Sequence, residues 1–150
     1  MKPFDQFTLM QFAWAALSIL GFSIRVNLKG RKIFWLAFGG GLSWAFYLII
    51  LYFSKSLMFS IFGSVILVCS YSEIVARLLK TPVSVFVTCV IIPLVPGSSL
   101  YYMMRAYIAG NTALASEQGY KVLLISGTIA MAIAIVSSAT NLIFRLRNRF

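Results

Sequence analysis

The 150-residue sequence contains no histidine, only three acidic residues and only two cysteines. The sequence therefore has almost no residues from which to form a metal site of histidine, cysteine and carboxylate ligands. It also has no histidine to pair with a cysteine nucleophile. Cys69 and Cys89 each lie inside an apolar run, where we expect buried structural thiols. These shortages predict a protein that is not an enzyme and that holds no metal and no cofactor.

Charge is scarce as well, because 11% of the residues are charged whereas 61% are hydrophobic, and the mean hydropathy is +0.93. Soluble domains are about 45–50% apolar and about 25% charged. The composition therefore predicts an integral membrane protein with one membrane domain over residues 1–150 and no separate soluble domain. The first apolar run has no small-residue cleavage site after it, so we expect it to be retained as a span.

Apolar runs of about 20 residues, the length that crosses a bilayer, predict an all-α protein with five transmembrane helices. The predicted spans are residues 7–24, 33–53, 57–76, 83–109 and 122–144. Residues 112–121 are polar enough to be predicted as a loop. The second span contains the run Gly39–Gly41, which would let a neighbouring helix approach closely.

The fourth span is predicted to be broken at Pro93–Ser99, which reads Pro-Leu-Val-Pro-Gly-Ser-Ser. Each proline removes a backbone N–H and clashes with the preceding helical turn. In hydrocarbon the freed backbone groups have no water to bond, so such a break is tolerated only where protein or a water-filled cavity surrounds it. Broken spans of this kind form binding sites in transporters. The alternative is a simple proline kink without a binding role.

A break at this point would give the second half-helix a new amino terminus near Ser98 and Ser99. Unpaired N–H groups at a helix amino terminus suit an anion such as a carboxylate. The first half-helix would end in free carbonyls near Ile91 and Ile92, which suit a cation or an ammonium group. Arg105, further along the span, either lines a polar path or extends to the membrane interface. The candidate substrate-binding residues are Pro93, Pro96, Gly97, Ser98, Ser99 and Arg105.

Glu73 and Arg77 lie four residues apart near the end of the third span. This order and spacing favour an ion pair on one helical face. The alternative is that Glu73 carries protons at a membrane boundary.

The formal net charge of +10 is unevenly distributed along the chain. With five crossings, one side of the membrane would hold nine bases: Arg25, Lys29, Arg31, Lys32, Arg77, Lys80, Arg145, Arg147 and Arg149. The other side would hold Lys2, Lys55, Arg105 and Lys121. The positive-inside rule then predicts an external amino terminus and an internal carboxyl terminus. Because the bases lie mainly at the ends of apolar runs, we expect the lipid bilayer and no nucleic acid as their partner.

Three segments, Ala76–Phe86, Ile91–Gly97 and Tyr101–Met103, resemble the carboxyl-terminal membrane half of the threonine/serine exporter family. The resemblance implies a subunit of a secondary transporter that exports threonine, serine or a related small solute across the plasma membrane of a prokaryote. It also implies a companion membrane subunit that resembles the family's amino-terminal half. Split two-protein members imply the alternative of dicarboxylate export, succinate in particular. Family members often have glycine where this chain has Ser98 and Ser99.

Small residues recur every four positions in the fifth span, at Ser126, Ala130, Ala134 and Ser138. Such a ridge is typical of a packing face against a neighbouring span or subunit. It leaves open a third hypothesis, in which the chain is a non-transporting scaffold that stabilises its companion.

Overall fold

The computed structural model of the chain describes residues 6–26, 28 and 30–147, with side chains described from Met10 to Ile143. Within these residues every regular element is a helix and no strand is present, so the all-α prediction is confirmed. The helices are α1 (Gln6–Arg25), α2 (Arg31–Ser54), α3 (Leu57–Leu78), α4 (Val83–Ile91), the 3-10 turn η1 (Ile92–Leu94), α5 (Gly97–Ile108) and α6 (Thr112–Arg147).

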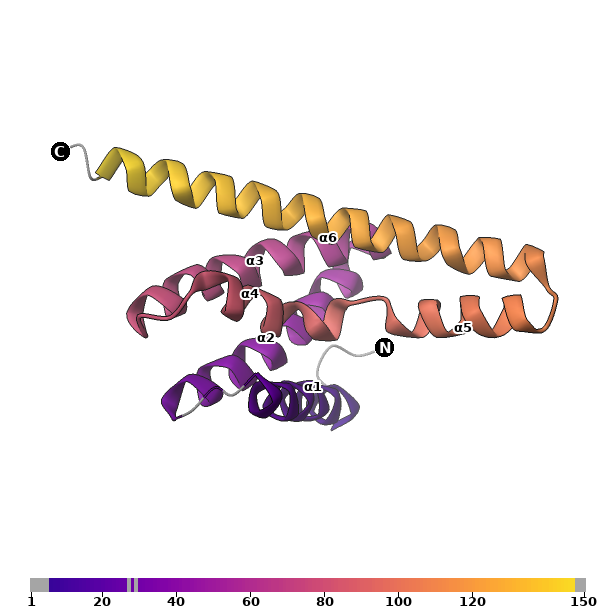
Figure 1. Cartoon of the computed structure of the whole chain (residues 1–150), viewed down its shortest axis with the longest axis horizontal. Coiled ribbons are helices and arrows are strands. Elements are labelled where there is room, and N and C mark those ends of the chain that lie inside the picture. Colours follow the sequence, from indigo (N-terminus) through magenta and orange to yellow (C-terminus); the bar gives the residue numbers. More distant parts are fainter. Residues whose placement is uncertain (1–5, 27, 29, 148–150) are drawn as a thin grey trace.

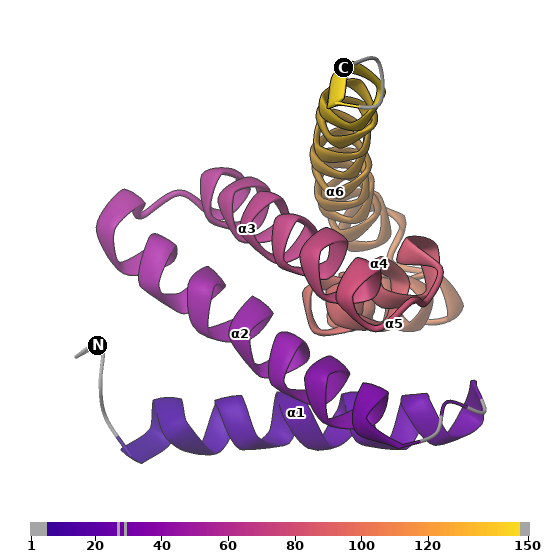
Figure 2. The same ribbon diagram turned by 90° about the vertical axis from the view of Figure 1, so that its left-hand side faces the viewer.

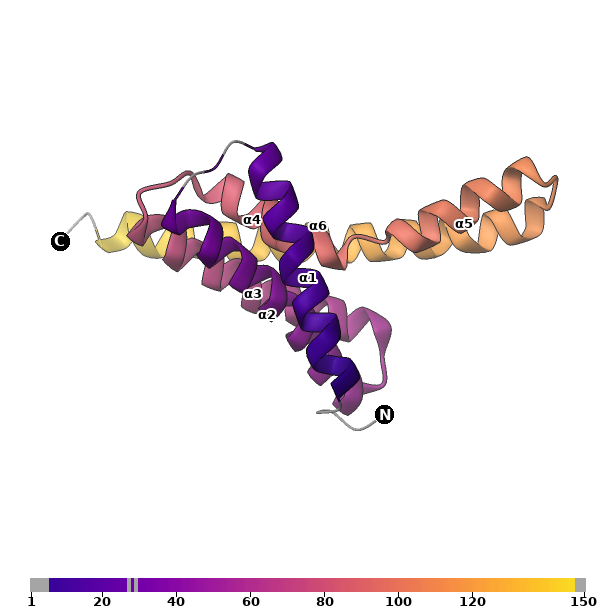
Figure 3. The same ribbon diagram turned by 90° about the horizontal axis from the view of Figure 1, so that it is seen from below.

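Membrane crossing is supported for several of these helices by their length and composition. Helices α2, α3 and α6 are long and apolar enough to span, and α4–η1 together with α5 makes a bent fourth candidate. The crossing by α1, which corresponds to the first predicted span, and the external amino terminus stay predictions. The start of α2 and the ends of α3 and α6 lie toward the same end of the molecule (Figures 1 and 3), which agrees with placing their basic flanks on one side. Three of the counted bases, Lys2, Lys29 and Arg149, lie outside the described residues.

The helices pack mainly in chain order. Figure 2 shows α1, α2 and α3 stacked one on the next, with α6 nearly end-on beside α3. Helix α4 packs between α2 and α3, whereas α5 packs mainly against the first half of α6. The pair formed by α5 and the start of α6, residues 97–121, extends beyond the other helices (Figures 1 and 3). We call this pair the α5–α6 arm.

The predicted loop at 112–121 is wrong, because these residues form the first turns of α6. Gly110 adopts the left-handed conformation, with φ 73°, that commonly ends a helix. Asn111 then caps α6, since its Oδ1 accepts a hydrogen bond of 3.1 Å from the N–H of Leu114. Glu117 and Lys121 add an ion pair of 2.7 Å one turn apart. The polar composition of residues 112–121 favours a loop, but the pair Gly110 and Asn111 indicates the end of one helix and the start of the next.

Two apolar clusters form the core. One joins α3, α4 and α6 through residues such as Val65, Val87 and Ile129. The other joins α1, α2, α3 and α4 through residues such as Ile19 and Phe86. The two cysteines lie one in each cluster as buried free thiols, as predicted.

Gly39–Gly41 confirm the predicted close packing, and α2 runs through them without a break. A Cβ atom at Gly39 would lie 2.7 Å from Cε1 of Tyr71 on α3. A Cβ atom at Gly40 would overlap Cγ1 of Ile19, and one at Gly41 would meet the ring of Phe12, both on α1. The glycines therefore bring α1 and α3 onto opposite sides of α2.

The small-residue ridge of α6 faces away from the described part of the protein. Its four members, Ser126, Ala130, Ala134 and Ser138, are all exposed. The buried face of α6 consists of Ile125, Ile129, Ala132 and Val136. The ridge therefore does not pack against any of the described helices, and its use by a neighbouring subunit stays a prediction.

Candidate functional site

The break in the fourth candidate span is shorter than predicted. Only Val95 and Pro96 are non-helical, because η1 continues α4 to Leu94 and α5 begins at Gly97. The two halves are nevertheless bent by 59° relative to each other. Residues 97–99, predicted to belong to the break, form the first turn of α5 instead.

The two prolines remove the N–H groups that would have bonded the carbonyls four residues earlier, those of Cys89 and Ile92. Both carbonyls accept bonds from three residues ahead instead, from the N–H of Ile92 and of Val95, the latter at 3.2 Å. The predicted free carbonyl at Ile92 is therefore wrong, since a tighter helical turn provides a donor. Pro96, with φ −75° and ψ 52°, is the centre of an inverse γ-turn in which Gly97 N–H bonds the Val95 carbonyl at 2.7 Å.

The first turn of α5 contains hydrogen-bond donors that have no partner among the described residues. No side chain caps this helix, and the first N–H groups of a helix have no partner within it. The hydroxyl groups of Ser98 and Ser99 make no hydrogen bond with any described residue. Several donors thus lie together within one turn, at the positive end of the helix dipole.

A cavity of about 240 Å³ opens beside this turn, and we call it the serine cavity. Helices α2, α3 and α6, the turn η1, the break and the start of α5 line it. The lining residues are Trp44, Tyr47, Leu57, Ile61, Pro93, Leu94, Val95, Pro96, Ser98, Ser99 and Ile125. Four of the six predicted site residues, Pro93, Pro96, Ser98 and Ser99, therefore meet at one cavity. Its walls are mostly apolar, with a few polar groups that would fix the orientation of a ligand, as small-molecule sites commonly have.

The break and its cavity lie within a region that matches a known family. A family model described as threonine/serine exporter covers residues 11–139. The chain belongs to the threonine/serine exporter family. No curated protein and no solved structure matches the chain.

The remaining predicted residues of this exporter lie elsewhere. Gly97 does not line the serine cavity and has open space around its Cα. Arg105 is exposed on α5, within the α5–α6 arm. Arg77 pairs with Glu73 at 2.8 Å near the end of α3, and neither residue lines the cavity. The ion pair that the spacing favours is thus present, while a proton-carrying role for Glu73 stays a prediction.

Sequence reasoning missed the aromatic wall that α2 contributes to the exporter's cavity. Trp44 and Tyr47 lie three residues apart on one helical face, with ring centroids 5.1 Å apart. Their spacing was a usable signal, because side chains at i and i+3 are neighbours on a helix. The Tyr47 hydroxyl has no hydrogen-bond partner among the described residues, so it adds a third hydroxyl to the cavity.

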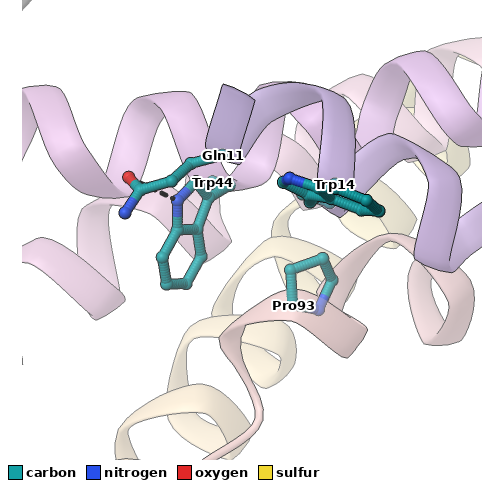
Figure 4. A pocket seen from close by; sticks show the side chains of 5 residues that line it. Gln11, Trp14, Trp44 and Pro93 are labelled. Carbon is teal, nitrogen blue, oxygen red and sulfur yellow. Dashed lines mark hydrogen bonds between the residues drawn. The ribbon is translucent and has the colours of Figure 1, made fainter. Parts of the chain in front are cut away.

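A second cavity, of about 250 Å³, lies beside the first, and we call it the tryptophan cavity (Figure 4). Its lining residues are Gln11, Trp14, Ala15, Trp44 and Pro93. Trp44 and Pro93 line both cavities. The indole Nε1 of Trp44 donates a hydrogen bond of 3.3 Å to Oε1 of Gln11, which ties α2 to α1 at this point.

Proposed function

We propose that this chain is a membrane subunit of a secondary transporter that exports threonine, serine or a closely related small solute across the plasma membrane of a prokaryote. The observation that carries the proposal is the serine cavity, which lies at a helix break within a chain of this family. A solute carboxylate would bind at the first turn of α5, where N–H groups and the helix dipole favour an anion. The hydroxyl groups of Ser98 and Ser99 would donate further hydrogen bonds to it.

One observation favours a second candidate, a dicarboxylate. No acidic side chain is among the described residues that line the serine cavity or the tryptophan cavity, so neither offers a carboxylate to an ammonium group. Hydroxyl groups, an amide and helix N–H groups are instead suited to carboxylate oxygens. An amino acid would place its ammonium group near backbone carbonyls of the break.

We further propose a companion subunit that resembles the amino-terminal half of the family. The outward-facing ridge on α6 supports this, because small residues let a second helix approach closely. If the chain were only a scaffold for that companion, changes in the serine cavity would leave transport intact.

An efflux experiment tests these proposals. Cells that lack their own threonine exporters express the chain with its companion, are loaded with a threonine-containing peptide, and are assayed for released threonine. The double variant Ser98→Ala/Ser99→Ala should lower efflux by roughly 10-fold, since each lost hydrogen bond is worth about 0.5–1.5 kcal/mol. Ser70→Ala is the matched control, because Ser70 is exposed on α3 and bonds only the Ile66 carbonyl of its own helix.

The outcomes separate the candidates. Efflux of threonine that depends on Ser98 and Ser99 supports the exporter and its site. Release of loaded succinate but not of threonine would favour the dicarboxylate. Normal efflux from a well-assembled double variant would show that the serine cavity does not bind the transported solute. The scaffold hypothesis would then be favoured.

A further inference from the structure

Bases gather at the end of the molecule where α2 begins and α3 ends (Figures 1 and 3). Those with described side chains are Arg25, Arg31, Lys32, Arg77 and Lys80. Among the described residues of this end, Glu73 is the one acid, and it pairs with Arg77. The side chains of the other four bases make no ion pair or hydrogen bond with any described residue. This end therefore carries an excess of positive charge that the described part of the chain does not neutralise.

A largely apolar surface lies beside these bases, where α2 and α3 run next to each other. It consists of Trp35, Phe38, Tyr71, Ile74 and Leu78, and we call it the α2–α3 seam. Arg31, Trp35 and Phe38 share one face of α2, because they are spaced by four and three residues, and all three are exposed. Tyr71 joins the two helices, since its hydroxyl bonds the Trp35 carbonyl at 2.9 Å and its ring centroid lies 6.4 Å from that of Phe38. The seam thus has a base at one end and exposed apolar side chains along the rest.

The charges of Arg31 and Lys32 do not stabilise the helix on which they lie. Both are in the first turn of α2, where the helix dipole disfavours cations. Bases next to a membrane span attract anionic lipids, and tryptophan is enriched where lipid head groups meet the acyl chains. A soluble anion would need only the bases, whereas the exposed apolar seam beside them suits a molecule that has both a phosphate and acyl chains.

We propose that the α2–α3 seam binds an anionic phospholipid. Its phosphate pairs with Arg31 and Lys32, and its acyl chains lie along the seam. The neighbouring bases raise the local positive potential, so they favour an anionic head group over a zwitterionic one. Lipid binding of this kind does not depend on which solute the proposed function moves. Bases that only orient the chain during insertion would instead give no preference between head groups in the inserted protein.

The experiment measures quenching of Trp35 fluorescence by lipids with brominated acyl chains. The chain has three tryptophans, so the parent variant Trp14→Phe/Trp44→Phe keeps Trp35 as its only one. The parent is reconstituted into phosphatidylcholine vesicles that contain brominated phosphatidylglycerol or, at the same fraction, brominated phosphatidylcholine. We expect phosphatidylglycerol to bind beside Trp35 about 10-fold more tightly, since each base near a membrane surface contributes about 5-fold.

Two further variants, made in the parent, test the assignment of the phosphate. Arg31→Gln/Lys32→Gln should reduce the preference for phosphatidylglycerol to within about 2-fold. Lys55→Gln/Lys121→Gln removes the same charge from the predicted opposite side of the membrane and should leave the preference unchanged. Lys55 suits this purpose because it follows the last residue of α2, at the end of the helix away from Arg31.

Several results would overturn the inference. They are equal binding of the two lipids in the parent, an unchanged preference in Arg31→Gln/Lys32→Gln, and the absence of quenching by either lipid, which would show that protein covers the seam. Loss of the preference in excess inorganic phosphate would indicate a site for soluble phosphate instead. If the parent does not fold, native mass spectrometry of the wild-type chain replaces the quenching. Phosphatidylglycerol should then stay bound to the wild type and be lost from Arg31→Gln/Lys32→Gln, and equal retention would overturn the inference.

Discussion

The run Gly39–Gly41 in α2 and the pair Pro93 and Pro96 after α4 are two places where the sequence weakens a helix, and they have opposite outcomes. Helix α2 continues through its glycines and has neighbours on both sides there. The chain at the prolines bends by 59° and opens a cavity of about 240 Å³. We refer to these regions as the glycine crossing and the proline break.

The difference follows from how glycine and proline each change the hydrogen bonding and the conformational freedom of the backbone. Glycine costs conformational entropy but keeps its N–H, so close packing can restore a helix that contains it. Proline lacks the N–H and clashes with the preceding turn, so no packing restores the missing bond. The glycine crossing therefore stabilises the fold, whereas the proline break leaves donors and space for a ligand. Substitutions at the two regions should affect different properties, assembly at the first and transport at the second.

Substitution at the centre of the glycine crossing should have the largest effect. Gly40→Val would push a branched side chain into Ile19, which is fully buried. Overpacking of a core typically costs about 1–3 kcal/mol, and here it would also separate α1 from α2. We expect little folded protein by size-exclusion chromatography in detergent and a lowered Tm for what remains.

The same substitution has a control and a rescue. Gly127→Val on α6 should be tolerated, because a Cβ atom there has open space. Gly40→Ala should recover when combined with Ile19→Ala, which removes the overlapping atoms. A stable Gly40→Val protein with normal Tm would show that α1 is not held against α2 as described.

Next in size is the effect of restoring a donor at the proline break. Pro96→Ala returns an N–H that can bond the Ile92 carbonyl, so it favours a straighter path from α4 into α5. We expect normal assembly, an efflux rate reduced by about 10-fold or more, and no fall in Tm. Efflux measured beside Tm on the same preparation checks both parts. Pro82→Ala, at the start of α4 and away from the cavity, is the control. Unchanged efflux in a straightened protein would mean that the bend is only a kink.

The sequence predicted these two regions unequally well. Gly39–Gly41 were recognised as a close-packing site, because small residues have few other reasons to cluster within a span. The break was also recognised, but its length was overestimated, since a 3-10 turn keeps Pro93 and Leu94 helical. Composition cannot show that turn, because it depends on which carbonyls find donors three residues ahead. Gln11, Trp44 and Tyr47 were missed since they come from other helices, and only the tertiary structure brings them to the prolines.

Substitution of one tyrosine in each region should distinguish an effect on stability from an effect on transport. The Tyr71 hydroxyl donates a hydrogen bond of 2.9 Å to the Trp35 carbonyl at the glycine crossing. Tyr71→Phe should therefore cost about 1 kcal/mol of stability and leave the KM for efflux unchanged. Tyr47→Phe removes a hydroxyl that has no described partner but lines the serine cavity. It should leave Tm unchanged and raise the KM by about 3-fold or more; the reverse assignment of effects would contradict the division between crossing and break.

The smallest effect is expected at the Glu73–Arg77 pair, which belongs to neither region. Glu73→Gln keeps an oxygen that accepts the 2.8 Å bond from Arg77, and Arg77 remains partly in contact with solvent, with 37% of its side chain exposed. Glu73 itself is buried, but the variant keeps a hydrogen-bond acceptor for Arg77, so the loss of stability should stay at about 1 kcal/mol or less, and efflux should stay within about 2-fold at every pH. Efflux measured between pH 5 and pH 8 in wild type and variant checks this. If Glu73 instead carries protons, the variant will lose its efflux and its pH dependence while Tm stays normal. Such a result would couple transport to the end of α3, and the proline break would then hold the solute without containing the whole mechanism.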